Sequence, residues 1–276
     1  MPQKIDLKIN SETGFKRKRV QILSLAVDVS GYKRATGRIL QMTKTGNGGG
    51  YVCFANVHMT MEAFDNERFA EAVNRADLVL PDGKPLFWMQ KLLGAKTAEQ
   101  TRGPAMMPLL CRYAEKNNLK VGFYGGKRST LNKLRNRLTK DFPRLQVNYL
   151  YSPPFRRLDA TETSEIVKQI NQAEIDILFV CLGCPKQEIW MAEHTEKINS
   201  VMLGVGASID FYAGEIREAP KILQKIGLEW LYRLIQEPGR LWHRYLLLNP
   251  RFIFQALLQL SGLKKNRRIT NAADGN

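Results

Sequence analysis

The feature that most constrains the fold of this chain is a regular alternation of short apolar runs with longer amphipathic stretches. Runs rich in β-branched and aromatic residues predict seven strands, at 20–29, 50–57, 76–82, 120–126, 145–151, 176–183 and 201–208. The stretches between them predict helices at 32–44, 61–75, 105–118, 129–141, 161–173 and 185–197. This alternation predicts an α/β, Rossmann-like fold: a mostly parallel sheet with helices on both faces.

The alternation stops after Gly214, and the sequence then turns helical. Pro220, Pro238 and Pro250 are expected to divide that stretch into short helices, because proline interrupts the helical hydrogen-bond pattern. Four segments follow in chain order: a flexible basic N-terminus (1–19), an α/β core (20–214), a C-terminal helical appendage (215–263) and a disordered basic tail (264–276). The glycine-rich stretch at 46–50 predicts a loop.

Composition narrows the class of protein further. The chain has 276 residues and a formal net charge of +16, and it contains no run of about 20 apolar residues that could span a bilayer. Its N-terminus lacks the apolar core of a signal peptide. Four cysteines are too few for a disulfide framework and are typical of a reducing compartment. We therefore expect a soluble, cytoplasmic, basic globular protein.

The basic excess suggests an anionic partner, such as nucleic acid, acidic lipid or sugar phosphate. Residues 215–276 hold eleven Lys and Arg against five Asp and Glu, interleaved with large apolar residues such as Trp230, Trp242 and Tyr245. This mixture suits a membrane surface better than a DNA groove. A pair of terminal helices that packs on the core and exposes a solvated basic face explains the pattern equally well.

Polar residues follow several of the predicted strands, where the carboxyl ends of parallel strands form a ligand crevice. Asp82, in a Pro-Asp-Gly turn, is a candidate general base or ribose-binding acid, or an ordinary turn aspartate. Asn56 follows the run at 50–55 by the same logic. Gln187 and Glu188 open a helix whose free backbone N–H groups could bind an anion, unless Glu188 only favours the helix dipole.

Other short motifs are weak or missing. The glycines of 204–214 give half of a dinucleotide fingerprint, and 124–127 is a glycine-rich turn that could hold phosphate, but neither is a Walker A loop. Cys181 and Cys184 lack the partner pair that a zinc site needs. No Asp-x-Asp, H-E-x-x-H or G-x-S-x-G motif is present, which argues against metalloenzymes and hydrolases. We predict no metal and no cofactor.

Several blocks nevertheless occur together in a specific order. They are FANVHM (54–59), ADLVLPDGKPLFW (76–88), RGPAMMPLL (102–110), VGFYGG (121–126), LGCPKQEIWM (182–191), GVGASIDFYAG (204–214), REAP (217–220) and GLEWLYRLIQEPGRLWHRY (227–245). Together they resemble the WecG/TagA/CpsF family of bacterial glycosyltransferases, over about residues 20–250. The PDGKP, PKQE and EWLYRL blocks are the most specific.

The resemblance implies an inverting glycosyltransferase that needs no metal. It implies transfer of a hexose-type sugar from a UDP-sugar donor to a polyprenyl-diphosphate-linked saccharide, in the synthesis of teichoic acid or other cell-surface polysaccharides. The sugar would be N-acetylmannosamine, its uronic acid or glucose. The enzyme would be cytoplasmic and peripherally bound to the inner face of the plasma membrane through its appendage.

The resemblance also assigns roles to residues. Asp82 matches the catalytic base, and Asn56 and Gln187 match groups of the same pocket. The remaining predicted substrate-binding residues lie in matching blocks: Arg102, Glu188, Asp210 and the appendage arginines Arg233, Arg240 and Arg244, which would reach the diphosphates. Phe54 stands where the family often has Thr, and Ala105 where Asp is common, so donor choice could differ.

Two other classes of function remain as alternatives. A nucleic-acid-binding protein is favoured only by the net charge, since the chain lacks a recognisable binding motif. A nicotinamide-dependent oxidoreductase would need a G-x-G-x-x-G motif after the first strand, where the chain has VDVSGYKR. We also expect the core to self-associate.

Overall fold

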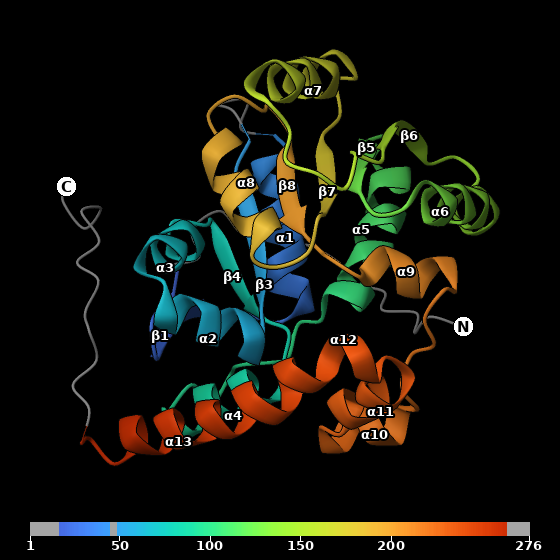
Figure 1. The fold of residues 1–276 in the computed structure, drawn as a ribbon. Helices are drawn as coiled ribbons and strands as arrows, with labels where there is room; N and C mark the ends of the chain where they lie inside the picture. The colour runs from blue at the N-terminus through green and yellow to red at the C-terminus, as the bar shows by residue number, and fades with distance from the viewer. Residues whose placement is uncertain (1–16, 45–48, 264–276) are drawn as a thin grey trace, which may run out of the picture.

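The computed structural model describes residues 17–44 and 49–263 (Figure 1). Its centre is a six-stranded sheet in the order β4-β3-β8-β7-β5-β6, in which every neighbouring pair is parallel. The strands are β3 (Tyr51–Ala55), β4 (Leu78–Pro81), β5 (Lys120–Gly125), β6 (Gln146–Tyr151), β7 (Ile177–Cys181) and β8 (Val201–Gly204). The predicted α/β fold is confirmed. The expectations for 1–16, for 264–276 and for most of the loop at 46–50 lie outside the described residues.

Helices cover both faces of this sheet, each over its own apolar cluster. One face carries α2 (Val57–Asp65), α3 (Glu67–Asn74), α7 (Ala160–Gln172) and α8 (Lys186–His194). The other carries α1 (Tyr32–Met42), α5 (Gly103–Lys116), α6 (Arg128–Asp141) and α9 (Ser208–Ala213). Burial on both faces explains why β3 and β7 are apolar throughout rather than alternating.

Two boundaries in the first third of the chain differ from the prediction. The run at 20–29 is an antiparallel hairpin of β1 (Arg19–Ile22) and β2 (Leu25–Asp28), outside the main sheet. Its turn contains Leu23, which has a φ of 51° in the left-handed region. The sequence has neither glycine nor proline here, so the turn could not be predicted. The predicted helix at 61–75 is two helices, α2 and α3, because the side chain of Asn66 caps the second by accepting from the Phe69 N–H.

Other departures concern single elements. Arg19 already belongs to β1, and Arg17 donates to Asp28 at 2.7 Å, so these two residues contact the core, whereas the prediction assigned them to a flexible N-terminus. The helix α4 (Lys84–Leu92) was not predicted. It begins directly after Gly83 with Pro85 in its first turn, a position that proline favours.

The connections around β3 and β4 create a crevice at the carboxyl end of the sheet. The chain leaves β3 for α2 on one face, and it leaves β4, by way of α4, for α5 on the other. Adjacent strands whose connections go to opposite faces form a topological switch point, where ligands bind in open α/β sheets. Since Ala55 pairs with Pro81, the next residues, Asn56 and Asp82, lie side by side at this point.

The appendage is helical, as predicted, but its divisions differ. It consists of α10 (Lys221–Ile226), α11 (Glu229–Gln236), α12 (Pro238–Trp242), the π-helical turn η1 (His243–Leu247) and α13 (Leu248–Leu260). Pro220 and Pro238 mark helix starts, whereas Pro250 lies inside an uninterrupted helical run. Pro250 has no N–H to donate to the carbonyl four residues earlier, and the wider π turn before it accommodates this loss.

The last helix anchors the appendage to the core beneath the sheet (Figure 1). Phe252 and Ala256 of α13 are buried in the apolar cluster that contains α2. Gln259 accepts from the Leu23 N–H at 2.9 Å and donates to the Gln21 carbonyl at 2.8 Å, so α13 is fastened to the β1–β2 hairpin. Within 17–44 and 49–263, no helix is long and apolar enough to cross a membrane.

Candidate active site

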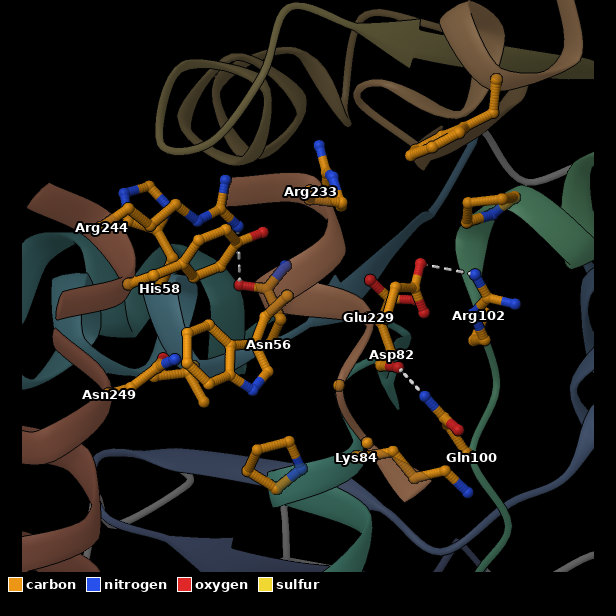
Figure 2. A pocket seen from close by; sticks show the side chains of 18 residues that line it. Asn56, His58, Asp82, Lys84, Gln100, Arg102, Glu229, Arg233, Arg244 and Asn249 are labelled. Atoms are coloured by element: carbon orange, nitrogen blue, oxygen red, sulfur yellow. Dashed lines mark hydrogen bonds and ion pairs between the residues drawn. The ribbon is translucent and has the colours of Figure 1, made fainter. Parts of the chain in front are cut away.

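A pocket that is open to solvent lies where the appendage covers the switch point (Figure 2). Core and appendage both contribute to its wall. Its polar lining residues include Asn56, His58, Asp82, Lys84, Gln100, Arg102, Glu229, Arg233, Arg244 and Asn249. The structure therefore brings five predicted site residues together: Asn56, Asp82, Arg102, Arg233 and Arg244.

Asp82 occupies the floor of this pocket, directly after β4. Its backbone N–H donates to the Ala55 carbonyl, and its Oδ1 accepts from the Gly103 N–H at 3.1 Å. The Gln100 amide fixes its carbonyl oxygen at 2.6 Å. Burial raises the pKa of Asp82 to about 6, an effect that Arg102 opposes and Glu229 reinforces. A rigid carboxylate whose pKa lies close to neutrality is well suited to accept a proton from a bound substrate.

Two arginines of the appendage line this pocket, Arg233 near Asp82 and Arg244 beside Asn56 and His58 (Figure 2). Arg233 comes from α11 and lies 5.1 Å from the centre of the Phe211 ring, and Arg244 comes from η1 and donates to Asn56 Oδ1 at 3.2 Å. The Nε of each is buried and has no hydrogen-bond partner among the described residues. Buried donors in folded proteins are nearly always paired, and guanidinium groups match phosphate geometry. The arrangement is therefore suited to bind an anion.

Asn56 and His58 complete this side of the pocket. Asn56 caps α2 by accepting from the Met59 N–H at 3.2 Å, so the same oxygen joins a core helix to Arg244. Burial and the nearby Arg244 charge lower the pKa of His58 to about 4, which keeps the ring neutral at pH 7. His58 therefore adds no positive charge beside Asn56, where the charge comes from Arg244.

Arg102 also lines the pocket, but its guanidinium is already engaged. It donates to Glu229 at 2.7 Å and to Gln224 at 2.5 Å, and both partners belong to the appendage. Its backbone N–H donates to the Tyr32 hydroxyl at 2.9 Å. Arg102 thus joins the core to the appendage across the pocket.

Four predicted substrate-binding residues lie outside the pocket lining. Gln187 is buried and donates to the Gly204 carbonyl at 3.0 Å and to Glu188, whose pKa burial raises to about 7. Arg240 forms an ion pair with Glu237 at 2.6 Å, and Asp210 lies in the first turn of α9 next to the lining residue Phe211. Substrate binding by these four residues stays a prediction.

Several lining residues were not singled out from the sequence. Glu229 and Trp230 lie in the EWLYRL block and His58 in the FANVHM block, so the blocks contained the signal without a role for them. Gln100 and Asn249 lie outside these blocks, and no motif in the sequence suggests that they contact a ligand. Across the described ranges, no group of three or more His, Cys, Asp or Glu residues is placed to hold a metal ion.

Known proteins are similar to this chain over the segments that form this site. The sequence model described as "Glycosyl transferase WecG/TagA/CpsF family" matches residues 20–266, which include every lining residue of the pocket. A protein of Bacillus spizizenii named N-acetylglucosaminyldiphosphoundecaprenol N-acetyl-beta-D-mannosaminyltransferase is 29% identical over 76% of this chain and 80% of its own length.

Proteins with the same name from two other species are also similar. The Bacillus subtilis protein is 25% identical over 80% of this chain and 82% of its own length. The protein of Staphylococcus aureus strain MW2 is 28% identical over 69% of this chain and 74% of its own length.

Proposed function

The chain belongs to the WecG/TagA/CpsF family and is a glycosyltransferase, and we propose that it moves an N-acetylmannosaminyl or related hexosyl group from a UDP-sugar to a polyprenyl-diphosphate-linked saccharide. The observation that carries this proposal is that one pocket holds the Asp82 carboxylate and two arginines whose Nε atoms are buried and have no hydrogen-bond partner in the described ranges. The family assignment leaves no support for a nucleic-acid-binding protein or an oxidoreductase.

The proposed reaction is a single displacement with inversion at the anomeric carbon. Asp82 accepts the proton of the acceptor hydroxyl while the oxygen of that hydroxyl forms a bond to the anomeric carbon. The bond between that carbon and the diphosphate breaks, and UDP leaves with the electron pair. The proton on Asp82 then passes to solvent, which restores the carboxylate.

The arginines support departure of the diphosphate. Negative charge grows on the leaving UDP during the displacement, and fixed donors aimed at developing charge lower the barrier. Arg233 and Arg244 are only slightly exposed, so their charges act in a medium that screens them weakly. We propose that they neutralise the diphosphate and that transfer needs no divalent metal.

The nucleoside end of the donor has a proposed place next to the pocket. Gly126, Gly183 and Gly206 follow β5, β7 and β8, and all three have positive φ, which glycine adopts readily, so three glycine turns lie at the same edge of the sheet. Asp210 lies at this edge, and Lys127 and Arg240 are among the charges that act on it. We assign Asp210 to the nucleoside, and Gln187 and Glu188 to the support of these loops.

The acceptor lipid gives a role to the apolar surface of the appendage. Among the described residues, twelve of the fifteen large apolar side chains that are exposed lie on it. They are Ile222, Ile226, Leu231, Ile235, Trp242, Leu246, Leu247, Ile253, Phe254, Leu257, Leu260 and Leu263. Exposed apolar side chains that gather on one segment are a feature of interaction surfaces, and lysines and arginines between them favour anionic lipid. We propose that this surface rests on the cytoplasmic face of the membrane.

The membrane proposal predicts the effect of a charge on this surface. The double substitution Phe254→Glu and Leu257→Glu should weaken binding to phosphatidylglycerol-containing vesicles about tenfold or more, because two side chains no longer enter the apolar layer. Phe155→Glu on the core is the control, at a phenylalanine that is even more exposed than Phe254, 86% against 59%. Cosedimentation that is equal for all three proteins, or absent for the wild type, would show that the membrane proposal is wrong.

The function itself is tested by release of UDP. Wild-type protein should release UDP from one sugar of a panel of UDP-glucose, UDP-N-acetylglucosamine and UDP-N-acetylmannosamine, and only when a short-chain polyprenyl-diphosphate-N-acetylglucosamine acceptor is added. A chelator should leave the rate unchanged, because the arginines provide the positive charge. Release of UDP without the acceptor would contradict the proposed acceptor. Loss of release when the chelator is added would contradict the proposal that transfer needs no metal.

A further inference from the structure

Arg102 contacts the appendage through its guanidinium group, and no step of the proposed reaction involves this contact. Arg102 holds Gln224 and Glu229 at once, and we call these three residues the Arg102 clasp. We propose that Glu229 is a positioning residue, which fixes α11 on the core beside Asp82 and so couples docking of the appendage to the base strength of Asp82. This inference deepens the proposed function and rests on it.

The clasp joins elements on both sides of the pocket. Gln224 belongs to α10 and Glu229 to the first turn of α11, so a single core side chain engages both helices. Gln224 is itself fixed, since its amide donates to the Ala219 carbonyl at 2.7 Å. The adjacent Gly103 N–H donates to Asp82. The backbone of Gly103 therefore holds the base, and the side chain of Arg102 holds the appendage. Figure 2 shows the Glu229 carboxylate beside Asp82 and directed at Arg102.

Little else in these two helices is buried. Neither α10 nor α11 contains a buried residue, although α11 carries Arg233 and Trp230 into the pocket. The side chains of Arg102 and Glu229 are 14% and 24% exposed, which makes this ion pair one of the less solvated pairs of the protein. Removing one partner of a pair with this little exposure leaves an unpaired charge, which costs more than the loss of a surface pair. The position of α11 therefore depends on the clasp.

The charged groups that face Asp82 explain the coupling. Arg102 and the Gly103 N–H act from the core side, and Glu229 and Arg233 act from α11. The tyrosine that faces this region, Tyr32, is neutral, because burial raises its pKa to about 12. Docking of α11 buries Asp82 and adds a second carboxylate, and both effects raise the pKa of Asp82; Arg233 opposes them. Asp82 is thus the stronger base when the appendage covers it.

Glu229→Gln tests the coupling through the pH profile. Loss of the Glu229 charge removes repulsion from Asp82 and releases Arg102 to attract it, so the pKa of Asp82 should fall. The acidic limb of kcat should therefore move to lower pH, by about half a pH unit or more, and kcat on the plateau should fall several-fold. Glu229→Asp should recover much of the wild-type profile. Glu215→Gln, which breaks the ion pair with Lys133 away from the pocket, is the matched control and should keep it.

Hydrogen exchange measures the docking of α11 without any turnover. Amides of 221–236 should exchange about tenfold faster or more in Glu229→Gln than in wild type, because a charge-assisted contact is lost. Unchanged exchange overturns the inference. Faster exchange with an unchanged pH profile also overturns it, because Glu229 would then only hold the helix. If wild-type protein releases no UDP at all, the proposed function is wrong. The coupling to Asp82 is then wrong as well, even if hydrogen exchange shows that the Arg102 clasp holds α11.

Discussion

Replacement of Asp82 by Asn is expected to lower kcat by about 10²–10⁴-fold, the usual contribution of a positioned general base. The amide has the shape of the carboxylate and can still accept from the Gly103 N–H, so the pocket should keep its geometry. It cannot take up the proton of the acceptor hydroxyl. Acceptor-dependent release of UDP measures the loss, and calorimetric titration with UDP should show an affinity within about threefold of wild type, since the diphosphate contacts remain.

The same substitution should not destabilise the protein, which separates a catalytic from a structural role. Burial raises the pKa of Asp82 from 3.8 to about 6 in the folded state, so stability falls as the pH rises between these two values and stays at the lower level above them. Asn is neutral at every pH. The free energy of unfolding at pH 8, from denaturant titration, should therefore equal or exceed that of the wild type. A variant that is unstable, or one that turns over normally, would contradict the assignment of Asp82 as the base.

Replacement of Arg244 or Arg233 by Met should lower kcat/KM by about 10²–10³-fold, the usual effect of removing one donor to developing charge. Met keeps the length and the packing of the side chain and removes the charge. Arg156→Met is the control, because Arg156 is an exposed arginine that pairs with Glu162 outside the pocket. Its activity should stay within about threefold of wild type, as is common for an exposed ion pair.

Steady-state kinetics at varied donor and acceptor concentration would assign the two arginines. Loss in kcat with little change in KM indicates contact with the leaving diphosphate in the transition state, whereas a rise in the KM for the acceptor alone indicates contact with the lipid diphosphate. Equal losses for Arg156→Met and Arg244→Met would contradict the anion site, because Arg244 lines the pocket and Arg156 does not.

The parts of the site predicted from the sequence are those that depend on strand ends. Asn56 and Asp82 each follow an apolar strand by one residue, and parallel pairing of β3 and β4 is enough to bring them together. Gln187 and Glu188 follow the same rule at β7, yet they are buried in α8. The rule gives the place where a helix starts. It does not give the face of that helix that turns inward, which depends on the packing of Met191 and its neighbours.

Contacts between distant segments could not be predicted in this way. The partners of Arg102 follow it by more than 120 residues, and no local pattern relates them. The turn at Leu23 contains neither glycine nor proline. Burial of Leu23 and the hydrogen bond that its N–H donates to Gln259 hold the hairpin instead. Resemblance to the family supplied Arg233 and Arg244, since composition alone identified only a basic and aromatic segment.

The bond from the Leu23 N–H to Gln259 joins positions 236 residues apart, which has a consequence for biosynthesis. A ribosome makes the chain from the N-terminus, so the hairpin emerges long before the helix that fastens to it. The sheet is complete once β8 has emerged, whereas the pocket still lacks Glu229, Arg233 and Arg244. A nascent or prematurely terminated chain can therefore build its core while it holds no assembled reaction centre. Catalytic competence comes only with the final stretch of translation.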